Sequence, residues 1–297
     1  MKLSNHESEL ILNPYGSLYH LHLKAGQIAD RIFFVGDPER VDLLALHFDS
    51  ITHKIRNREF YTLSGFIGKQ FLSVISTGIG TDNIDIVWNE LDAVFNFDLE
   101  KRQIKSEFQE LRVLRLGTCG GLQASIPTGS LVHSRFAIGA DGLMHFYDTQ
   151  EYSNLNFQKA LLDFQVDKLP STPAFYAAEA SESFSQLVSR SAHEIHQGIT
   201  LTAAGFYGPQ GRNLGRLKLR CPNLPESLSK FRFQGIPVLN LEMETAGILA
   251  LGKGLGHQAA SLSVILANRA TGKFSPHPRK AIEKLLTIGI ELMLAWD

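Results

Sequence analysis

Residues 111–121 read LRVLRLGTCGG, and this stretch decides the predicted fold. Its first half alternates and then becomes apolar over residues 113–116, a pattern typical of a mostly buried strand in an α/β sheet. Three glycines follow, placed around Thr118 and Cys119. Because glycine has no side chain, we expect a turn at the carboxyl end of this strand, in which exposed backbone N–H groups bind an anion.

Arg115 lies inside the apolar part of this stretch. A guanidinium group is rarely buried without a charged or polar partner. Phosphate is the simplest partner, and a buried Asp or Glu in an architectural ion pair is the alternative. The residues alone leave both partners open.

The composition of the chain limits its class. A chain of 297 residues that is 44% hydrophobic can bury a full core, as one large α/β domain or as two smaller ones. Twenty-nine basic residues against 30 acidic ones give a formal charge of −1. This balance predicts no broad surface for nucleic acid or an anionic membrane, so any phosphate that is bound is small and local.

Cysteines and apolar runs predict the location of the protein. Cys119 and Cys221 form neither a CxxC spacing nor a disulfide framework, which indicates a reducing compartment, the cytoplasm, and no cysteine-based metal site. The apolar run at 10–12 is too short for the core of a signal peptide. The apolar run at 285–296 is interrupted by Glu291 and suits an amphipathic core helix rather than a membrane span.

The N-terminal region carries two histidines. Residues 1–18 are predicted to form a polar extension, in which Asn-Pro-Tyr-Gly at 13–16 marks a turn. The alternating stretch that follows places His20 and His22 on one face of a strand, facing a metal or a sugar hydroxyl. For His22 we favour a solvated or core histidine.

Apolar periodicity and turn signals predict the elements of the chain. Strands are expected at 31–36, 51–65, 70–77, 129–142, 199–203, 236–244 and 259–267. Helices are expected at 38–48, after an N-cap at Asp82, and at 157–164, 182–192, 245–255 and 278–296. Residues 97–110 are charged and helical in composition.

Two segments near the start of the chain place charged residues next to the end of a predicted strand. Gly36 ends a strand and Pro38 begins a helix, which makes a second anion site with Arg40. Taken alone, this motif favours Arg40 as an ordinary solvated helix charge. Arg58 stands with Arg56 beside a carboxylate, a spacing usual for a surface ion-pair cluster. The sequence Ser-Thr-Gly-Ile-Gly at 76–80 lacks the third glycine of a dinucleotide fingerprint, so NAD binding is weakly indicated.

The loop at 205–212 reads GFYGPQGR and predicts recognition of a flat ring. Its two aromatic residues can stack on a base. Gln210 offers a donor and an acceptor side by side and Arg212 offers a fork of donors, a combination that matches an imide edge such as that of uracil. The alternative is an exposed turn whose polar residues bind no ligand.

Glu242 and Glu244 close the strand predicted at 236–244. Two positions apart, they share a strand face and can project into one crevice, although acidic residues near a helix N-terminus also serve as partners of the helix dipole. Arg269 likewise follows a buried strand. Ligands bind at the carboxyl ends of strands in α/β sheets. Because several predicted strands have polar residues at that end, the sequence predicts a binding site there.

Six motifs together carry a resemblance to a known family: GDPER at 36–40, NREF at 57–60, STGIG at 76–80, RLGT at 115–118, Phe206-Tyr207 with Gln210 and Arg212, and EME at 242–244. In this order the chain resembles the uridine phosphorylases of the nucleoside phosphorylase type I family, from about Tyr19 to Arg269.

The resemblance implies a single domain over residues 1–297. The implied fold is a three-layer α/β/α arrangement with a twisted, mixed and partly barrel-like central sheet. The implied reaction is reversible phosphorolysis of uridine to uracil and ribose 1-phosphate, in pyrimidine nucleoside salvage. It implies no organic cofactor and no metal, and a homo-oligomer whose minimal active unit is a dimer, with a hexamer as the larger assembly. The sequence leaves open a monovalent cation near Glu59.

The resemblance also implies roles for individual residues. Phosphate would be held by Gly36, Arg40, Arg58, Arg115 and Thr118. The nucleoside would be held by His20, Cys119, Gly120, Phe206, Gln210, Arg212, Glu242, Met243, Glu244 and Arg269. Catalysis would rest on Arg115, Gln210, Arg212 and Glu244, while His20 and Arg58 would reach in from a neighbouring subunit.

Departures from the family pattern define the alternatives. Cys119 stands where many uridine phosphorylases have a second Thr, and residues 97–110 resemble a helical insertion that could favour a dimer over a hexamer. Purine-cleaving relatives carry an aspartate where this chain has Asn268-Arg269, which disfavours purines. The alternatives are a nucleosidase or purine nucleoside phosphorylase of the same fold, and a non-catalytic nucleoside-binding protein.

Overall fold

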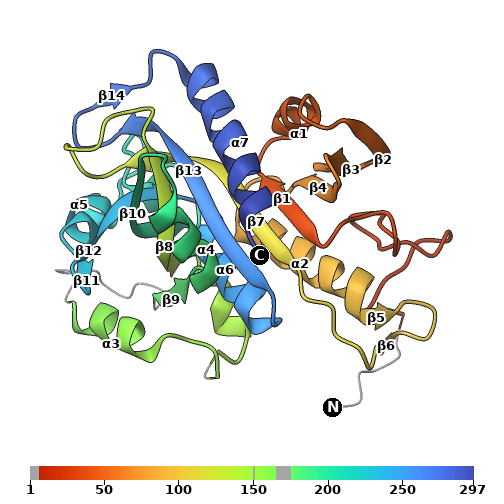
Figure 1. Cartoon of the computed structure of the whole chain (residues 1–297). Helices are drawn as coiled ribbons and strands as arrows, with labels where there is room; N and C mark the ends of the chain where they lie inside the picture. The colour runs from red at the N-terminus through yellow and green to blue at the C-terminus, as the bar shows by residue number, and fades with distance from the viewer. Residues whose placement is uncertain (1–6, 150, 165–174) are drawn as a thin grey trace. The chain divides into compact units, whose positions relative to one another are not determined.

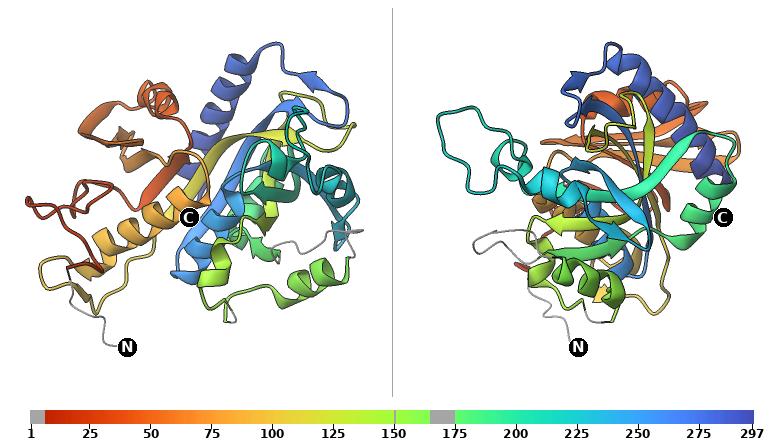
Figure 2. Two further views of the ribbon diagram at one scale, coloured as in Figure 1. Left: turned by 180° about the vertical axis from the view of Figure 1, so that it is seen from behind. Right: turned by 90° about the vertical axis from the view of Figure 1, so that its left-hand side faces the viewer.

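The computed structural model describes residues 7–149, 151–164 and 175–297 (Figure 1). The chain divides into two compact units. The first comprises Met1–Val113 and Leu255–Gln258, and the second comprises Leu114–Gly254 and Ala259–Asp297. We describe each unit by itself, and Figure 2 shows their strands and helices from two further sides.

The first unit contains four strands of the main sheet, in the order β1-β4-β3-β2. Its strands are β1 (Arg31–Val35), β2 (Ser50–Asn57), β3 (Phe60–Ile67) and β4 (Gln70–Ser76). β1 and β4 are parallel, while β3 is antiparallel to both of its neighbours. The predicted strand at 51–65 is therefore two strands, because the chain reverses at Arg58, whose φ of 53° lies in the left-handed region.

Two helices complete the first unit. α1 (Pro38–Ala45) begins as predicted with Pro38 in its first turn, and the Asp37 side chain caps it by accepting from the Glu39 N–H at 2.9 Å. α2 (Thr81–Asn96) buries Ile84, Val87, Trp88 and Leu91, the predicted apolar face. Asp82 is not its N-cap: the helix begins one residue earlier and Gly80 is the capping position, without a side-chain hydrogen bond.

The second unit contains a closed sheet. Its five strands are β7 (Arg112–Gly121), β8 (Leu131–Ala140), β10 (Ile195–Ala203), β12 (Ile236–Glu242) and β13 (Gln258–Asn268). They follow the order β12-β10-β8-β13-β7, and β12 also pairs with β7, which closes the sheet. The mixed, partly barrel-like sheet expected from the sequence is confirmed. Short strands β9 (Tyr176–Glu179), β11 (Arg232–Phe233) and β14 (Lys273–Phe274) extend it.

β7 shows why the glycine stretch does not form the predicted turn. The strand continues through all three glycines to Gly121, and its last two residues, Gly120 and Gly121, pair with Leu241 and Asn240 of β12. This pairing joins β7 to β12 and so closes the barrel.

Helices cover the closed sheet. Four of them have bounds close to those predicted: α3 (Leu155–Asp163), α4 (Glu182–Arg190), α6 (Thr245–Gly254) and α7 (Pro278–Ala295). The short helix α5 (Leu224–Ser229) and the 3-10 turns η1 (Leu143–Phe146) and η2 (Gly208–Gln210) were not predicted. An aromatic cluster packs under α3, where the Phe157 ring lies 5.2 Å from that of Phe136 and 4.8 Å from that of Phe233. This apolar contact fixes α3 on the sheet.

Residues 97–110 do not form the predicted helical insertion. They contain a small hairpin of β5 (Phe97–Asp98) and β6 (Gln103–Ile104). The Asp98 side chain accepts from the Lys101 N–H at 3.0 Å, and the left-handed φ of 50° at Arg102 then reverses the chain. Such side-chain turns compete with a helix even where the composition is helical.

Two further predictions fail locally. The alternating stretch around His20 and His22 is not a strand, because His22 adopts a φ of 56° within a turn. The strand predicted at 236–244 ends at Glu242, so Glu244 lies beyond it and the two carboxylates do not share a strand face.

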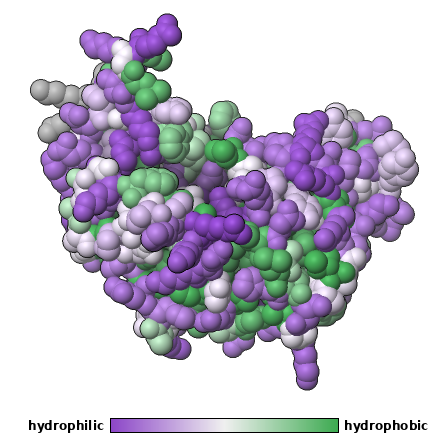
Figure 3. All heavy atoms as spheres, turned by 90° about the horizontal axis from the view of Figure 1, so that it is seen from above, coloured by the Kyte–Doolittle hydropathy of each residue, from purple (hydrophilic) through white to green (hydrophobic). Residues whose placement is uncertain are grey.

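The surface offers no membrane-crossing element within the described ranges, since none of their helices is both long and apolar enough to span a bilayer. The face drawn in Figure 3 carries hydrophilic and hydrophobic residues side by side.

Candidate active site

In the first unit, Arg40 lies next to the glycine that ends β1. A Cβ placed on Gly36 would be 3.8 Å from Arg40 Nη2 and 3.5 Å from the Gly78 carbonyl oxygen. The guanidinium group therefore turns back from α1 toward the carboxyl end of β1, where the N-terminus of α1 also points. A positive charge and a helix N-terminus at one strand end suit an anion.

His20 and Arg58 also lie in the first unit and share a neighbour. The guanidinium of Arg58 lies 5.6 Å from the centre of the Tyr19 ring, which contacts the His20 ring edge-on at 4.9 Å. His20 Nδ1 lies 2.6 Å from Glu90 Oε1, and the side chain of Asn57 donates to the His20 carbonyl at 2.8 Å. These contacts hold His20 and Arg58 together on one part of the unit.

In the second unit, Arg115 is almost fully buried and is paired with both predicted carboxylates. Its Nη2 lies 2.6 Å from Glu244 Oε2 and 3.0 Å from Glu242 Oε2, and its Nη1 donates to the Ser263 hydroxyl at 3.0 Å. Burial alone would lower the pKa of Arg115, but the charges of Glu242 and Glu244 outweigh it and raise that pKa above its ordinary value. Of the two partners left open by the sequence, the structure shows the carboxylates.

Gly117 makes room for this guanidinium. A Cβ at Gly117 would fall 1.8 Å from Arg115 Nη1 and 2.3 Å from Arg115 Cζ, so no other residue fits without moving the arginine. The side chain of Arg115 therefore folds over the backbone two residues further along β7. The glycine that the sequence suggested for an anion-binding turn is instead required by the arginine beside it.

Glu242 and Glu244 are held at the junction of β12 and α6. Glu242 Oε2 accepts from the backbone N–H groups of Glu244 at 3.0 Å and Thr245 at 2.9 Å, the first groups of the helix. The carboxylate is thus a partner of the helix N-terminus, the alternative that the sequence left open. Through the same oxygen it also binds Arg115.

The loop that contains Gln210 and Arg212 forms a compact cluster. The guanidinium of Arg212 lies 3.8 Å from the centre of the Phe206 ring and donates to the Phe206 carbonyl at 2.7 Å and to Gln210 Oε1. Gln210 is 2% exposed, whereas Phe206 is about half exposed, at 51%. The loop is therefore ordered around its predicted polar residues and is not an idle turn.

Arg269 joins this cluster from the end of β13. Its Nη1 donates to the Gln210 carbonyl at 3.0 Å, and its Cγ lies 3.6 Å from the place of a Cβ on Gly120. Burial and the charge of Arg269 lower the pKa of Arg212, and burial lowers that of Arg269. Neither arginine forms an ion pair with a carboxylate within the described part of the chain.

Three other predicted residues lie on the same elements. Thr118 is partly exposed on β7, and Met243 is partly exposed between β12 and α6. Cys119 is buried on β7, where its thiol contacts the Val264 carbonyl at 3.6 Å, and burial raises its pKa to about 12. A thiol with this pKa stays protonated near neutral pH, so Cys119 is present as the neutral thiol.

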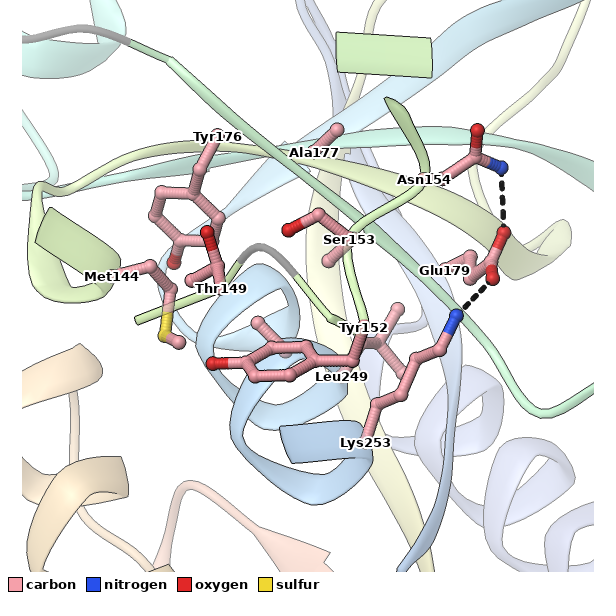
Figure 4. Close-up of a pocket in the computed structure, with 12 residues that line it drawn as sticks. Met144, Thr149, Tyr152, Ser153, Asn154, Tyr176, Ala177, Glu179, Leu249 and Lys253 are labelled. Atoms are coloured by element: carbon pink, nitrogen blue, oxygen red, sulfur yellow. Dashed lines mark hydrogen bonds and ion pairs between the residues drawn. The ribbon is translucent and has the colours of Figure 1, made fainter. Parts of the chain in front are cut away.

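Two cavities of the second unit differ greatly in size. A cavity of about 410 Å³ borders Arg269 and is lined by Leu122, Pro222, Asn223, Pro225, Glu226, Ser229 and Ala270. Cavities of this size accept small organic ligands. The cavity of Figure 4, where Asn154, Glu179 and Lys253 are linked by hydrogen bonds, has a volume of only about 10 Å³. It has room for about one water molecule and cannot hold a nucleoside.

Sequence reasoning missed two residues of the Arg115 cluster. Ser263 of β13 accepts from Arg115, and Thr202 of β10 donates to Glu242 Oε1 at 2.6 Å. Both are small hydroxyl residues in buried strands, and only strand pairing brings them to the charged residues. Among the described residues there is no group of three or more His, Cys, Asp or Glu side chains that could hold a metal ion.

Comparison with known proteins places the chain in a family. The model of the "Phosphorylase superfamily" matches residues 30–291, most of the chain. A uridine phosphorylase of Thermococcus kodakarensis is 28% identical over 95% of this chain and 88% of its own length. A guanosine phosphorylase of Halorubrum lacusprofundi is 25% identical over 85% of this chain and 84% of its own length.

A solved structure agrees with this assignment. The nucleoside phosphorylase of Trypanosoma brucei, described as showing uridine phosphorylase activity, superposes with a TM-score of 0.82 at 30% identity and covers 96% of this chain and 99% of its own. The family match and the closed five-stranded sheet lead to one conclusion: the chain is an enzyme of the phosphorylase superfamily.

Proposed function

We propose that this enzyme is a uridine phosphorylase, which converts uridine and phosphate into uracil and ribose 1-phosphate. The observation that carries the proposal is the convergence of Arg212 and Arg269 on Gln210, without a carboxylate partner for either arginine in the described part of the chain. Two neighbouring guanidinium groups repel each other, and an electron-rich ligand relieves that repulsion.

Uracil suits this cluster at the moment of bond cleavage. Breaking the glycosidic bond places negative charge on the leaving base, and positioned donors such as Arg212 and the Gln210 amide stabilise it as an oxyanion hole does. The Phe206 ring, about half exposed, offers a surface on which a flat base can stack. The base is thus recognised by donors on its edge and an aromatic ring on its face.

The Arg115 cluster suits the other half of the reaction. In the second unit we assign phosphate binding to Arg115 and Thr118. In the first unit we assign anion binding to Gly36 and Arg40, which lie together at the end of β1. Phosphate is both the nucleophile and the counter-charge for the cationic sugar, and holding it in line supplies much of the rate. Glu244, with Met243 beside it, would fix the ribose through its hydroxyl groups.

A purine nucleoside is the second candidate substrate, because a guanosine phosphorylase also aligns with most of the chain. Asn268-Arg269 argues against it. Asn268 is 2% exposed and donates to the Gln123 and Ile126 carbonyls at 2.9 and 2.8 Å, so its amide is committed to the protein backbone. It is neither an acid nor directed at a base, whereas purine release benefits from protonation of the leaving base.

The substrate is tested by comparing uridine with inosine and guanosine in phosphate buffer, for the wild type and for Arg212→Ala. We expect cleavage of uridine to exceed that of both purine nucleosides, and Arg212→Ala to lower uridine turnover on the order of a hundredfold because one charged donor is lost. The matched control is Arg216→Ala, an exposed arginine in the same loop, which should retain the wild-type rate. Faster cleavage of inosine, or equal rates for the two arginine variants, would contradict the assignment of the base site.

We further propose that the reaction needs no organic cofactor and no metal, and that the protein is a homo-oligomer. Uridine and phosphate supply every atom of the products, so the chain's contribution is binding and positioning. His20 and Arg58, which lie together in the first unit, are the residues proposed to complete the site of a neighbouring subunit.

A further inference from the structure

Thr202 of β10 is fully buried beside a charged residue. The parallel pairing of β10 with β12 sets Thr202 opposite Glu242, just as Thr200 is set opposite Asn240 two residues earlier. The Thr202 hydroxyl donates to Glu242 Oε1 at 2.6 Å and accepts from the Ala246 N–H of α6 at 2.8 Å. Its side chain has no solvent exposure.

The direction of these hydrogen bonds is fixed by chemistry. The Ala246 N–H can only donate, so the hydroxyl oxygen is its acceptor, and the hydroxyl proton is left to point at Glu242. The hydrogen bond from a hydroxyl to a carboxylate is of the charge-assisted, stronger kind. Thr202 thereby ties the first turn of α6 to the Glu242 side chain.

The charges around Glu242 explain why this tie matters. The Arg115 guanidinium bridges two carboxylates, and the side chains of Arg115, Glu242 and Glu244 are 7%, 2% and 8% exposed. The second negative charge in such a buried group needs hydrogen-bond donors. Two backbone N–H groups serve Glu242 Oε2, and the Thr202 hydroxyl serves Oε1.

We infer that Thr202 is a positioning residue of phosphorolysis: through its hydroxyl it fixes the Glu242 carboxylate, and through Glu242 it fixes the Arg115 guanidinium and the backbone of Glu244. Thr202 is not assigned a contact with substrate. The inference rests on the proposed function and adds to it a residue that no motif of the sequence marks.

Loss of the hydroxyl has a defined structural consequence. Glu242 Oε1 and the Ala246 N–H would both be left buried without their partner, which is costly, so the carboxylate would rotate toward another donor. Because Glu242 Oε2 is shared by Arg115 and the N–H groups of Glu244 and Thr245, a rotation moves the proposed phosphate ligand. The effect should therefore appear first in the use of phosphate.

The experiment compares Thr202→Val, which removes the hydroxyl at constant shape, with Thr202→Ser, which retains it. We expect Thr202→Val to lower kcat/KM for phosphate about tenfold, the value of one hydrogen bond to a charged group, and Thr202→Ser to restore it. Most of the change should lie in KM for phosphate, with KM for uridine little altered.

The matched control is Thr200→Val on the same strand. Thr200 is equally buried, but its hydroxyl bonds to Asn240 and Ser134 and not to a charged residue. We expect this variant to lose thermal stability and to keep the wild-type KM for phosphate. A purely structural role for Thr202 would make the two valine variants alike, which would overturn the inference.

Two further outcomes keep the test decisive. If Thr202→Val does not fold, Thr202→Ala removes the same hydroxyl and should show the same rise in KM for phosphate, with Thr200→Ala as its control. Wild-type enzyme that forms no ribose 1-phosphate would remove the proposed function and this inference with it. Active wild type with a Thr202→Val variant that matches Thr200→Val would remove the inference alone.

Discussion

Gly117 shows how one residue decides the geometry of the site. The sequence marks Gly117 and Arg115 as unusual, and this much could be predicted from an arginine in an apolar run followed by glycine. The structural role of this glycine could not be predicted. A bend in the backbone and a space for a neighbouring side chain both require a residue without a Cβ, so the sequence does not distinguish them. Only the fold shows the guanidinium lying over residue 117.

We predict that Gly117→Ala lowers phosphorolysis on the order of a hundredfold, the effect of misplacing one charged ligand. The added methyl carbon would lie 1.8 Å from Arg115 Nη1, so the guanidinium must leave its place between Glu242 and Glu244. Steady-state kinetics with varied phosphate measure the effect, and circular dichroism confirms that the variant is folded. A folded variant with wild-type kinetics would show that the position of Arg115 is unimportant.

At the scale of elements, apolar periodicity predicts most of the strands and helices, and two of the failures occur where a side chain bonds to the backbone. Residues 97–110 have a helical composition, yet Asp98 accepts from the Lys101 N–H and starts a hairpin. The strand that ends at Glu242 is shorter than predicted because Glu242 itself accepts the first N–H groups of α6. Such contacts depend on geometry that composition does not contain.

β8 contains a buried histidine that makes the free energy of unfolding depend on pH. His133 lies at 0% exposure, with Nδ1 3.2 Å from the Ser261 carbonyl and Nε2 3.0 Å from the Ser185 hydroxyl. Burial lowers its pKa to about 4, below the ordinary histidine value of 6.5. Between these pH values the unfolded chain binds more protons than the folded one, so the free energy of unfolding falls as pH falls through this window.

We predict that this histidine makes the free energy of unfolding at pH 4.5 roughly 2 kcal/mol lower than at pH 7. In His133→Gln the titrating group is absent, so the loss between the two pH values should shrink by that amount, even if the variant is less stable throughout. Urea unfolding at several pH values measures this. His47→Gln changes an exposed histidine and serves as the control; an unchanged pH dependence in His133→Gln would contradict the assignment.

At the scale of the whole molecule, the family and the barrel-like sheet were predicted from the six motifs that resemble uridine phosphorylases. The comparisons confirm the family and the strand pairing confirms the sheet. The same motifs predict active sites that are shared between neighbouring subunits, and a single chain cannot display such sites. In the second unit, the predicted residues Glu242 and Glu244 gather around Arg115, and Arg212 and Arg269 gather around Gln210. Hydroxyl partners such as Thr202 were beyond prediction because strand register alone selects them.

Subunit exchange tests the proposed sharing of sites. We predict that Arg58→Ala and Arg115→Ala are each nearly inactive, and that mixing them after partial denaturation restores activity. If Arg58 serves the neighbouring subunit, a mixed dimer contains one site with both wild-type arginines, so random exchange should regain roughly a quarter of the wild-type activity. No recovery in mixtures shown to have exchanged would place Arg58 and Arg115 in the same subunit's site.

The most direct test of the account measures uracil release from uridine as the phosphate concentration is raised from zero, with ribose 1-phosphate assayed alongside. The account predicts negligible release without phosphate, saturable release with it, and one ribose 1-phosphate for each uracil. Equal release in phosphate-free buffer, with free ribose as the product, would identify a nucleosidase, and binding of uracil without any turnover would identify a non-catalytic protein; either result would contradict phosphorolysis.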